Sequence, residues 1–337
     1  MPPIGADGPR VAQGERLLRA QPLYFCAMTI LVCGSMAYDT IMVFPDQFKK
    51  HILPEQIHIL NIAFLVPELR REFGGTAGNI AYNLKLLGDD PLIMATVGHD
   101  FDPYEARLAM LGLSPRHVRR LDDQFTAQAF ITTDIDDNQI TAFHPGAMSH
   151  SHLNRVADAP GARFGIVSPD GRQGMIEHAR DFAAAGIPYI FDPGQGLPMF
   201  SGAELLELIA GAASLTVNDY EARIVEQKTG KRPEEVAKLV DCLAVTLGAE
   251  GSTLWIDGDR YPVPPVEAEA LVDPTGCGDA YRAGLLHGMA RGWSWLKSAR
   301  LASVMGALKI SHRGGQNHRP SREAINERLR QDFGETL

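Results

Sequence analysis

Short apolar runs alternate with helix-like segments through most of this sequence, and this alternation constrains the fold more than any other feature. An early apolar run at 29–34 is followed, from residue 88 onward, by further runs of strand length, at 91–98, 164–167, 188–191, 215–217 and 243–246. Helical patterns lie between these runs, at 103–111, at 171–185 and from Asn218 onward. This alternation predicts an α/β fold with a mainly parallel central sheet and helices on both faces.

Two regions interrupt this alternation with strand-like runs that have no helix between them. The first covers about 40–72 and includes an apolar run at 57–66 bracketed by prolines. The second covers about 124–144, where alternating runs at 127–134 and 139–143 flank a polar turn in a hairpin pattern. We expect the two regions to form a small separate β-sheet. That sheet could be a lid over a site or could pair two subunits, so a monomer and a homodimer are both open.

The N-terminal segment differs from the rest of the chain in composition. Residues 1–27 are rich in Pro, Gly, Ala and Arg without a core pattern. We therefore expect a disordered extension followed by one domain over 28–337, with Met28 as a candidate start. The run at 22–32 loosely resembles a signal peptide, but a buried strand explains 29–33 better, which favours a cytoplasmic protein.

Charge and cysteine usage narrow the expected partners. The net charge is −9 and no basic stripe is present, which argues against a nucleic-acid surface. The cysteines at 26, 33, 242 and 277 form no C-x-x-C pair, so we expect reduced thiols in a cytoplasm. No apolar run reaches the length of a membrane span. Small molecules are therefore the expected partners, with no nucleic acid and no membrane.

The stretch 273–280, Asp-Pro-Thr-Gly-Cys-Gly-Asp-Ala, is the strongest candidate for chemistry. Gly276 and Gly278, on either side of Cys277, allow the backbone to turn tightly and to present N–H groups at a helix N-terminus, which attracts anions. Asp279 would then be a carboxylate base beside a phosphate-binding anion hole. The alternative is an ordinary glycine-rich helix start capped by Asp279.

Polar and glycine residues after the first strand form a second candidate group. Asp39 follows the run at 29–34, and ligands of parallel α/β sheets bind outside the carboxyl ends of strands; the alternative is an Asp in a turn. Gly74 and Gly75 let the backbone approach a ligand closely, unless they only start a helix. Asn79, in the first turns of that helix, offers a donor and an acceptor to hydroxyl groups.

Two later strand ends carry a third group. Asn218 and Glu221 lie three residues apart at the start of a helix, on one helical face. An amide oxygen and a carboxylate suit Mg²⁺ bound through water, but an N-cap Asn with its capping-box partner gives the same pattern. Thr246, Gly248 and Gly251 follow the next strand and could line a nucleotide, or form a hairpin turn. They are not a Walker loop, because the chain lacks its Gly-Lys-Ser/Thr ending.

The remaining candidates carry weaker signals. Gln195, in the segment 192–196, could contact the polar edge of a ring, although a plain turn explains this segment better. His144, His150 and His152 lie close together in the sequence without the partners and spacing of a zinc site. We interpret them as part of a polar loop.

The order of these motifs along the chain is more informative than any one of them. The motifs are Gly34-x₄-Asp39, Gly74-Gly75-x₃-Asn79, Asn218-x₂-Glu221, Thr246-x-Gly248-x₂-Gly251 and Asp273-x-Thr275-Gly276-x-Gly278-Asp279. In this order they resemble the ribokinase-like, or PfkB, family of carbohydrate and nucleoside kinases, from about Met28 to the C-terminus. The segments 38–67, 74–79 and 191–196 look most like bacterial adenosine and nucleoside kinases. A ribokinase would also carry a Lys near Thr76, which is absent here.

The resemblance implies a ribokinase-like fold and an ATP-dependent kinase acting on the 5′-hydroxyl of a purine nucleoside, with adenosine as the first expectation and AMP as its product. Asp279 would deprotonate the acceptor hydroxyl, and the N–H groups of residues 276–278 would stabilise the transferring phosphoryl group. Closure of the small sheet would exclude water from the reaction.

The resemblance also implies roles for the other candidates. Asn218 and Glu221 would hold Mg²⁺ through water. The expected ATP-site residues are Asn218, Thr246, Gly248 and Gly251. The expected nucleoside-site residues are Asp39, Gly74, Gly75, Asn79, Gln195 and Ser35, which stands where related adenosine kinases have a base-contacting Asn. Many family members use K⁺ near the anion hole, and Asp273 and Thr275 match part of that site.

Four alternatives remain open from the sequence. The acceptor could be another nucleoside, inosine or guanosine, or a sugar such as ribose or fructose. The same fold could also serve as a non-catalytic ligand sensor, against which an intact Asp279 argues. A nucleotide-binding oxidoreductase is remote, because no G-x-G-x-x-G follows the first strand.

Overall fold

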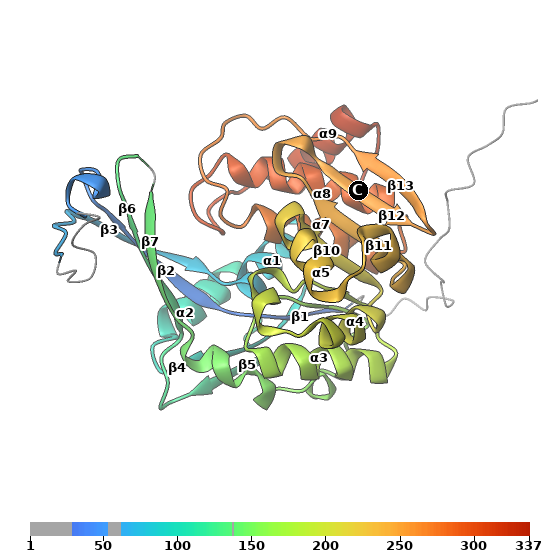
Figure 1. Ribbon diagram of the computed structural model, residues 1–337, viewed down its shortest axis with the longest axis horizontal. Helices are drawn as coiled ribbons and strands as arrows, with labels where there is room; N and C mark the ends of the chain where they lie inside the picture. The colour runs from blue at the N-terminus through green and yellow to red at the C-terminus, as the bar shows by residue number, and fades with distance from the viewer. Residues whose placement is uncertain (1–28, 53–61, 137) are drawn as a thin grey trace, which may run out of the picture.

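A nine-stranded sheet forms the centre of the molecule in the computed structural model, which describes residues 29–52, 62–136 and 138–337 (Figure 1). Its order is β13-β12-β11-β10-β9-β8-β1-β4-β5. These strands are β1 (Ile30–Cys33), β4 (Leu92–Gly98), β5 (His117–Leu121), β8 (Phe164–Val167), β9 (Tyr189–Phe191), β10 (Ser214–Asn218), β11 (Cys242–Thr246), β12 (Ser252–Ile256) and β13 (Asp259–Val263). All neighbours from β11 to β5 are parallel, and β12 and β13 add an antiparallel edge.

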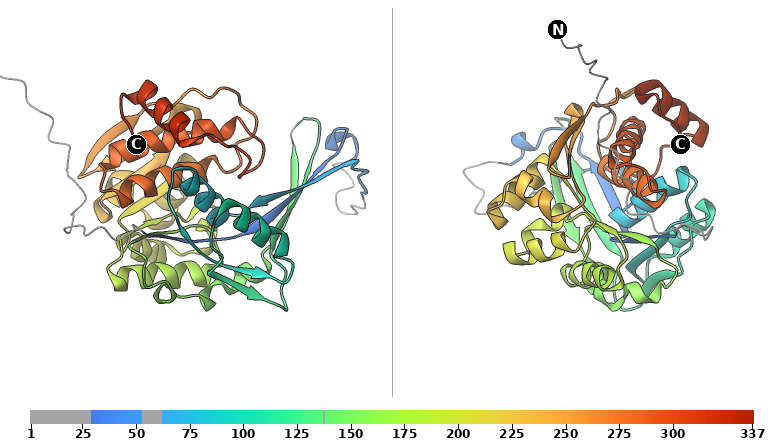
Figure 2. Two further views of the ribbon diagram at one scale, coloured as in Figure 1. Left: turned by 180° about the vertical axis from the view of Figure 1, so that it is seen from behind. Right: turned by 90° about the vertical axis from the view of Figure 1, so that its right-hand side faces the viewer.

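Helices cover both faces of this sheet, as Figure 2 shows for the yellow-green helices on one side and the orange-red helices on the other. They are α1 (Thr76–Leu86), α2 (Asp102–Leu111), α3 (Arg172–Ala185), α4 (Gly202–Ala210), α5 (Asp219–Thr229), α6 (Pro233–Val236), α7 (Cys277–Ala290), α8 (Trp295–Ile310) and α9 (Arg322–Phe333). Strand β1 shows why its sequence is apolar throughout. Ile30 and Val32 pack into the core under α1, α7 and α8, whereas Leu31 and Cys33 pack into the core under α3 and α4.

A second sheet of four strands projects from the main body, at the left of Figure 1, with the order β3-β2-β6-β7. Its strands are β2 (Ala37–Val43), β3 (Glu68–Gly74), β6 (Ala127–Thr133) and β7 (Gln139–His144). The pairs β2–β3 and β6–β7 are antiparallel, and β2–β6 is parallel. Because β2 starts only a few residues after β1, the small sheet grows out of the carboxyl edge of the large one. The predicted small sheet is therefore confirmed, as is the α/β class with a mainly parallel central sheet and helices on both faces.

Two strands differ from the sequence prediction. The strand expected at 57–66 is wrong where it can be compared, because residues 62–66 have no regular secondary structure and residues 53–61 lie outside the described part of the chain. The strand in this region is instead β3, which contains the charged sequence Glu-Leu-Arg-Arg-Glu. Sequence reasoning missed it because a strand of a sheet with exposed faces does not require an apolar run. Strand β5, His-Val-Arg-Arg-Leu, was not predicted; charged residues are typical of a sheet edge.

The structure bears on two further expectations, the disordered N-terminal extension and the absence of a membrane span. The expected disordered extension, residues 1–27, lies outside the described residues. Within the part of the chain that the structure describes, no helix combines the length and the apolar character needed to cross a bilayer.

Candidate active site

The strand order of the large sheet places a candidate site at the carboxyl end of β1. This strand lies between β4 and β8, so the order reverses at β1, and ligands of open α/β sheets bind in the crevice at such a reversal. The residues that follow β1 and β8 are joined there, since the Ser35 N–H donates to the Pro169 carbonyl at 3.1 Å. The small sheet begins at the same point, because β2 follows directly.

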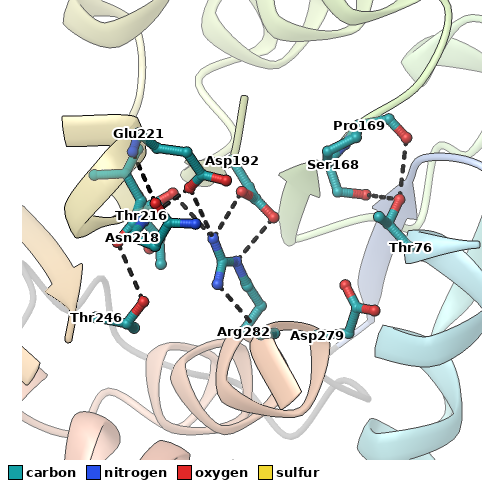
Figure 3. Close-up of polar contacts among 12 residues, drawn as sticks. Thr76, Ser168, Pro169, Asp192, Thr216, Asn218, Glu221, Thr246, Asp279 and Arg282 are labelled. Carbon is teal, nitrogen blue, oxygen red and sulfur yellow. Dashed lines mark hydrogen bonds and ion pairs between the residues drawn. The ribbon is translucent and has the colours of Figure 1, made fainter. Parts of the chain in front are cut away.

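Helix α1 starts at this edge of the sheet, and Figure 3 shows the Thr76 hydroxyl hydrogen-bonded to Ser168 and Pro169, which follow β8. Gly75 precedes the helix with a φ of 84°, and a Cβ there would lie 2.6 Å from the Ala37 nitrogen, so glycine is required. The Thr76 N–H donates to the Ser35 hydroxyl at 3.2 Å, and the Thr76 hydroxyl donates to the Pro169 carbonyl at 3.1 Å. The Ser35 hydroxyl thus supports the helix start, and its contact with a base stays a prediction.

Asp39 lies within β2 rather than in a turn, so the turn alternative is wrong. Its carboxylate covers Gly74, where a Cβ would lie 2.4 Å from Asp39 Oδ2; this contact explains why Gly74 has no side chain. Burial, as the largest cause, and the negative charges of Asp273 and Glu72 together raise the pKa of Asp39 to about 6. Asp39 therefore shares a partly desolvated space with the segment that precedes α7.

Asn79 joins the two halves of the candidate site, 200 positions apart in the sequence. Its Nδ2 donates to Asp279 Oδ2 at 2.8 Å. Its Oδ1 accepts from Gln316 Nε2 at 3.1 Å, and Gln316 also bonds the Tyr104 hydroxyl at 2.6 Å. Asn79 thus contacts Asp279 directly, and this hydrogen bond orients the Asp279 carboxylate. Sequence reasoning missed Gln316 and Tyr104; the pair Gly314-Gly315 before Gln316 was the available signal.

The start of α7 has the features of an anion-binding helix N-terminus. Gly276 is the N-cap with a φ of 79° and makes no side-chain cap, and Asp279 lies in the first turn instead of capping it. The alternative in which Asp279 caps the helix is therefore wrong. The Cys277 N–H donates to the Pro274 carbonyl at 3.1 Å, which closes a turn. The other N–H groups of a first helical turn have no partner within the helix and carry its positive dipole end.

The pKa of Asp279 lies well above the usual value of an aspartate. Burial raises its pKa to about 7, while the Asn79 hydrogen bond and the Arg282 guanidinium oppose the rise and the carboxylates of Asp192 and Asp39 add to it. A carboxyl group that titrates near pH 7 can accept a proton from a substrate and release it again, which is the property required of a general base.

A buried ion pair between Arg282 and Asp192 packs against the first turn of α7. Arg282 Nε donates to Asp192 Oδ2 at 2.8 Å and its Nη2 donates to Asp192 Oδ1 at 2.9 Å (Figure 3). Arg282 Nη1 also donates to the Gly278 carbonyl at 3.3 Å. Arg282 and Asp192 are only 6% and 3% exposed. Removing either side chain would leave the other charge buried without a partner, which is energetically costly. Sequence reasoning missed this pair, because the two residues are 90 positions apart.

Asn218 and Glu221 form a capping box at the start of α5, one of the two arrangements predicted for them from the sequence. The Glu221 N–H donates to Asn218 Oδ1 at 2.7 Å, and the Asn218 N–H donates to Glu221 Oε2 at 2.8 Å. Burial raises the pKa of the half-buried Glu221 carboxyl. Glu221 lies 4.0 Å from Arg282, and Thr246 pairs with Asn218 across β10 and β11. The capping role is confirmed, and one oxygen of Glu221 is not used by it.

The glycines that follow β11 form a tight connection to β12. Gly248 and Gly251 have φ angles of 59° and 85°, and a Cβ on Gly251 would lie 2.3 Å from the Val263 carbonyl oxygen, whereas Gly248 faces open space. The hairpin alternative for this segment is therefore confirmed. Gln195 is exposed, in a short 3-10 turn over Gly194–Met199. Contacts of these residues with ATP or a base stay predictions.

The side chains named so far do not form a preformed metal cluster. Among residues 29–52, 62–136 and 138–337, no three His, Cys, Asp or Glu side chains are grouped to hold a metal ion, and this includes the three clustered histidines. Asp273 is engaged by backbone, since its Oδ1 accepts from the Thr275 N–H and its Oδ2 from the Gly314 N–H, both at 2.8 Å.

Comparisons with known proteins point to one family. The model of the family described as "pfkB family carbohydrate kinase" matches residues 36–322. A nucleoside kinase of Methanocaldococcus jannaschii is 30% identical over 272 residues, which cover 80% of this chain and 89% of that protein.

Solved structures agree with this assignment. A Burkholderia thailandensis nucleoside kinase in complex with inosine is 51% identical, with a TM-score of 0.83 over 91% of this chain and 99% of that one. Its complex described as ADP-inosine is 52% identical, with a TM-score of 0.81 over 91% of this chain and 97% of that one. A ribokinase of Thermotoga maritima, 20% identical with a TM-score of 0.75 over 90% of this chain and 99% of that one, shows the shared fold.

Proposed function

The chain belongs to the pfkB family of carbohydrate kinases, and on this premise we propose that it transfers the γ-phosphoryl group of ATP to the 5′-hydroxyl of a purine nucleoside. Adenosine is the acceptor that the sequence favours. Inosine is the second candidate, because the Burkholderia thailandensis kinase that is 51% identical to this chain was solved with inosine.

The observation that carries the proposal is the pairing of Asp279 with the open N-terminus of α7. Asp279 is oriented by Asn79 at 2.8 Å, and its pKa lies at about 7. Its ionised form would take the proton of the acceptor hydroxyl as the oxygen attacks the γ-phosphorus. The N–H groups around Gly276 and Gly278 would receive the negative charge that the transferring phosphoryl group carries.

The nucleoside would bind between β2 and α1. The Asp39 carboxylate and the backbone at Gly74 and Gly75 suit two neighbouring ribose hydroxyls, because a carboxylate accepts hydrogen bonds and a glycine backbone permits close approach. Asn79 would contribute through its bond to Asp279. Ser35 and Gln195 remain the proposed residues nearest the base.

ATP would bind along the ends of β10 and β11, at Asn218, Thr246, Gly248 and Gly251. The donor set there fits Mg²⁺ held through water, because one oxygen of Glu221 is left over by the capping box. When bound, Mg²⁺ would neutralise phosphate charge. The small sheet would act as a lid that excludes water, a proposal that leaves open whether it also pairs two subunits.

The direct test is ADP release from Mg-ATP with adenosine, inosine, guanosine, cytidine, ribose and fructose at equal concentrations. We expect turnover with a purine nucleoside and mass-spectrometric identification of its 5′-monophosphate. Turnover with ribose or fructose alone would contradict the nucleoside assignment. ATP binding without turnover on any of the six would favour a ligand sensor.

A further inference from the structure

A lysine lies beneath the anion-binding turn, where the mechanism above gives it no role. Lys309, in the last turn of α8, is completely buried. Its ammonium donates to the Asp273 carbonyl at 2.8 Å and to the His312 carbonyl at 2.9 Å. It therefore joins the segment that leads into α7 to the segment that follows α8.

The backbone surrounds the Lys309 ammonium in the way that it would surround a bound metal cation. Backbone carbonyls replace the water shell of the charge, and Lys309 stands at the C-terminal, negative end of its own helix. The same two segments are further joined by the N–H groups of Val272 and Asp273, which both donate to the Ile310 carbonyl at 3.0 Å. A buried lysine is rare unless it is paired in this way.

The K⁺ ion that the family resemblance implies does not fit the ligands present. K⁺ is bound in proteins by backbone carbonyls that replace its water. The Asp273 carbonyl is already occupied by Lys309, and both Asp273 carboxylate oxygens accept backbone N–H groups, from Thr275 and from Gly314. A second cation at these oxygens would also lie against the buried ammonium, and the two like charges would repel each other.

We propose that the Lys309 ammonium is a built-in replacement for the monovalent cation, so that this kinase works without K⁺. The inference rests on the proposed kinase function. The fixed charge holds the turn from Asp273 to Gly276 in the shape that presents the N–H groups of α7. It also adds a positive charge beneath the site where phosphate charge gathers.

The first experiment compares monovalent ions with the unaltered protein. ADP release is measured with Mg-ATP and the accepted nucleoside in tetramethylammonium chloride, NaCl and KCl at equal ionic strength. We expect rates that agree within about twofold in the three salts, because a fixed ammonium needs no free ion. A severalfold activation that is specific to KCl would overturn the proposal.

The second experiment removes the charge. Lys309→Met should lose most of its activity in tetramethylammonium chloride and recover part of it in KCl, because K⁺ can then enter between the Asp273 and His312 carbonyls. Lys297→Met is the control, since Lys297 lies on the same helix over the Trp293 ring and should leave the rate unchanged in every salt. A Lys309→Met variant with full activity in tetramethylammonium, or one that folds and stays inactive in both salts, would overturn the proposal.

A readout without turnover separates this inference from the proposed function. The Tm of each protein is measured in KCl and in tetramethylammonium chloride, with no substrate present. We expect a stabilisation specific to K⁺ in Lys309→Met and none in the unaltered protein. The reverse pattern would overturn the cation role of Lys309, whatever the substrate. Absence of turnover on every acceptor in every salt would instead contradict the kinase function.

Discussion

The N-termini of α5 and α7 both lie at the candidate site, where Glu221 of α5 is 4.0 Å from Arg282 of α7. The first N–H groups of the two helices are satisfied in different ways. At α5, Asn218 and Glu221 cap each other's backbone N–H groups, so the helix start is satisfied by its own side chains. At α7, the N-cap is Gly276, and no side chain caps the first turn. In a capped start the side chains satisfy the first N–H groups of the helix, whereas an uncapped start leaves N–H groups and a dipole for an anion. Our proposal therefore places the transferring phosphoryl group at α7, and a role of the α5 start in binding Mg-ATP is a separate proposal.

The largest expected effect tests the α7 start directly. Asp279→Asn keeps the shape and the contact with Asn79 but removes the base, so we expect kcat to fall by about 10²–10⁴-fold. Steady-state ADP release measures this, with circular dichroism to check folding. Asp219→Asn, in the first turn of α5, is the matched control and should leave kcat unchanged. Equal kcat for the Asp279 variant and the unaltered protein would remove the difference between the two helix starts.

The next effect concerns the ion pair that supports α7. Arg282→Met leaves the Asp192 carboxylate buried and unpaired, so we expect the free energy of unfolding to fall by about 3–5 kcal/mol. Urea denaturation measures this loss. The control is Arg180→Met, which breaks the exposed pair with Glu207 and should cost at most about 1 kcal/mol. Similar losses in both variants would mean that burial does not set the strength of the Arg282 pair.

The pH dependence of the rate follows from Asp279. Its pKa is raised to about 7, and only the ionised form accepts a proton, so kcat/KM should fall about tenfold per pH unit below that value and level off above it. Asp39, with a pKa raised to about 6, should add a second, lower inflection through nucleoside binding. Rate profiles from pH 5 to 9 check this. A profile that stays flat down to pH 5 would contradict a base that titrates near pH 7.

A smaller effect comes from the glycine that starts α7. Gly276→Ala must hold a φ of 79° and pushes a methyl group to within 3.0 Å of the Gly315 Cα, so we expect a loss of about 1–2 kcal/mol in stability and a lower kcat. Gly230→Ala is the control, with a similar φ of 68° and no neighbour within 4 Å. Stability should fall in both variants and kcat only in the first. A parallel loss of kcat in both would show that the effect is not local to α7.

The smallest effect tests whether the α5 cap also serves ATP. Asn218→Ala should lower stability by about 1 kcal/mol, and so should Ser201→Ala, which removes the equivalent capping box of α4. If Asn218 also supports Mg-ATP, only its variant should raise the KM for Mg-ATP. Thermal unfolding and initial rates measure the two effects. Unchanged KM values in both variants would make α5 purely structural.

Local patterns explain which parts of the site could be predicted. The capping box of α5 and the glycine start of α7 each involve residues within a few positions of one another, so their spacing was visible in the sequence. The partners of Asp279 and Asn79 were not, because Asn79 is 200 positions from Asp279 and 237 from Gln316. The strand β3 was misplaced because its charged residues carry no burial signal.

The sequence by itself determined the alternation that makes a parallel sheet, the order of the kinase motifs and the chemistry available at Asp279. The tertiary structure alone decided how that chemistry is set. It raises the pKa of Asp279 by burial, pairs Arg282 with Asp192 and brings the Lys309 ammonium beneath Asp273. Periodicity and capping act over a few residues, whereas desolvation and charge pairing depend on which distant segments the folded chain brings together.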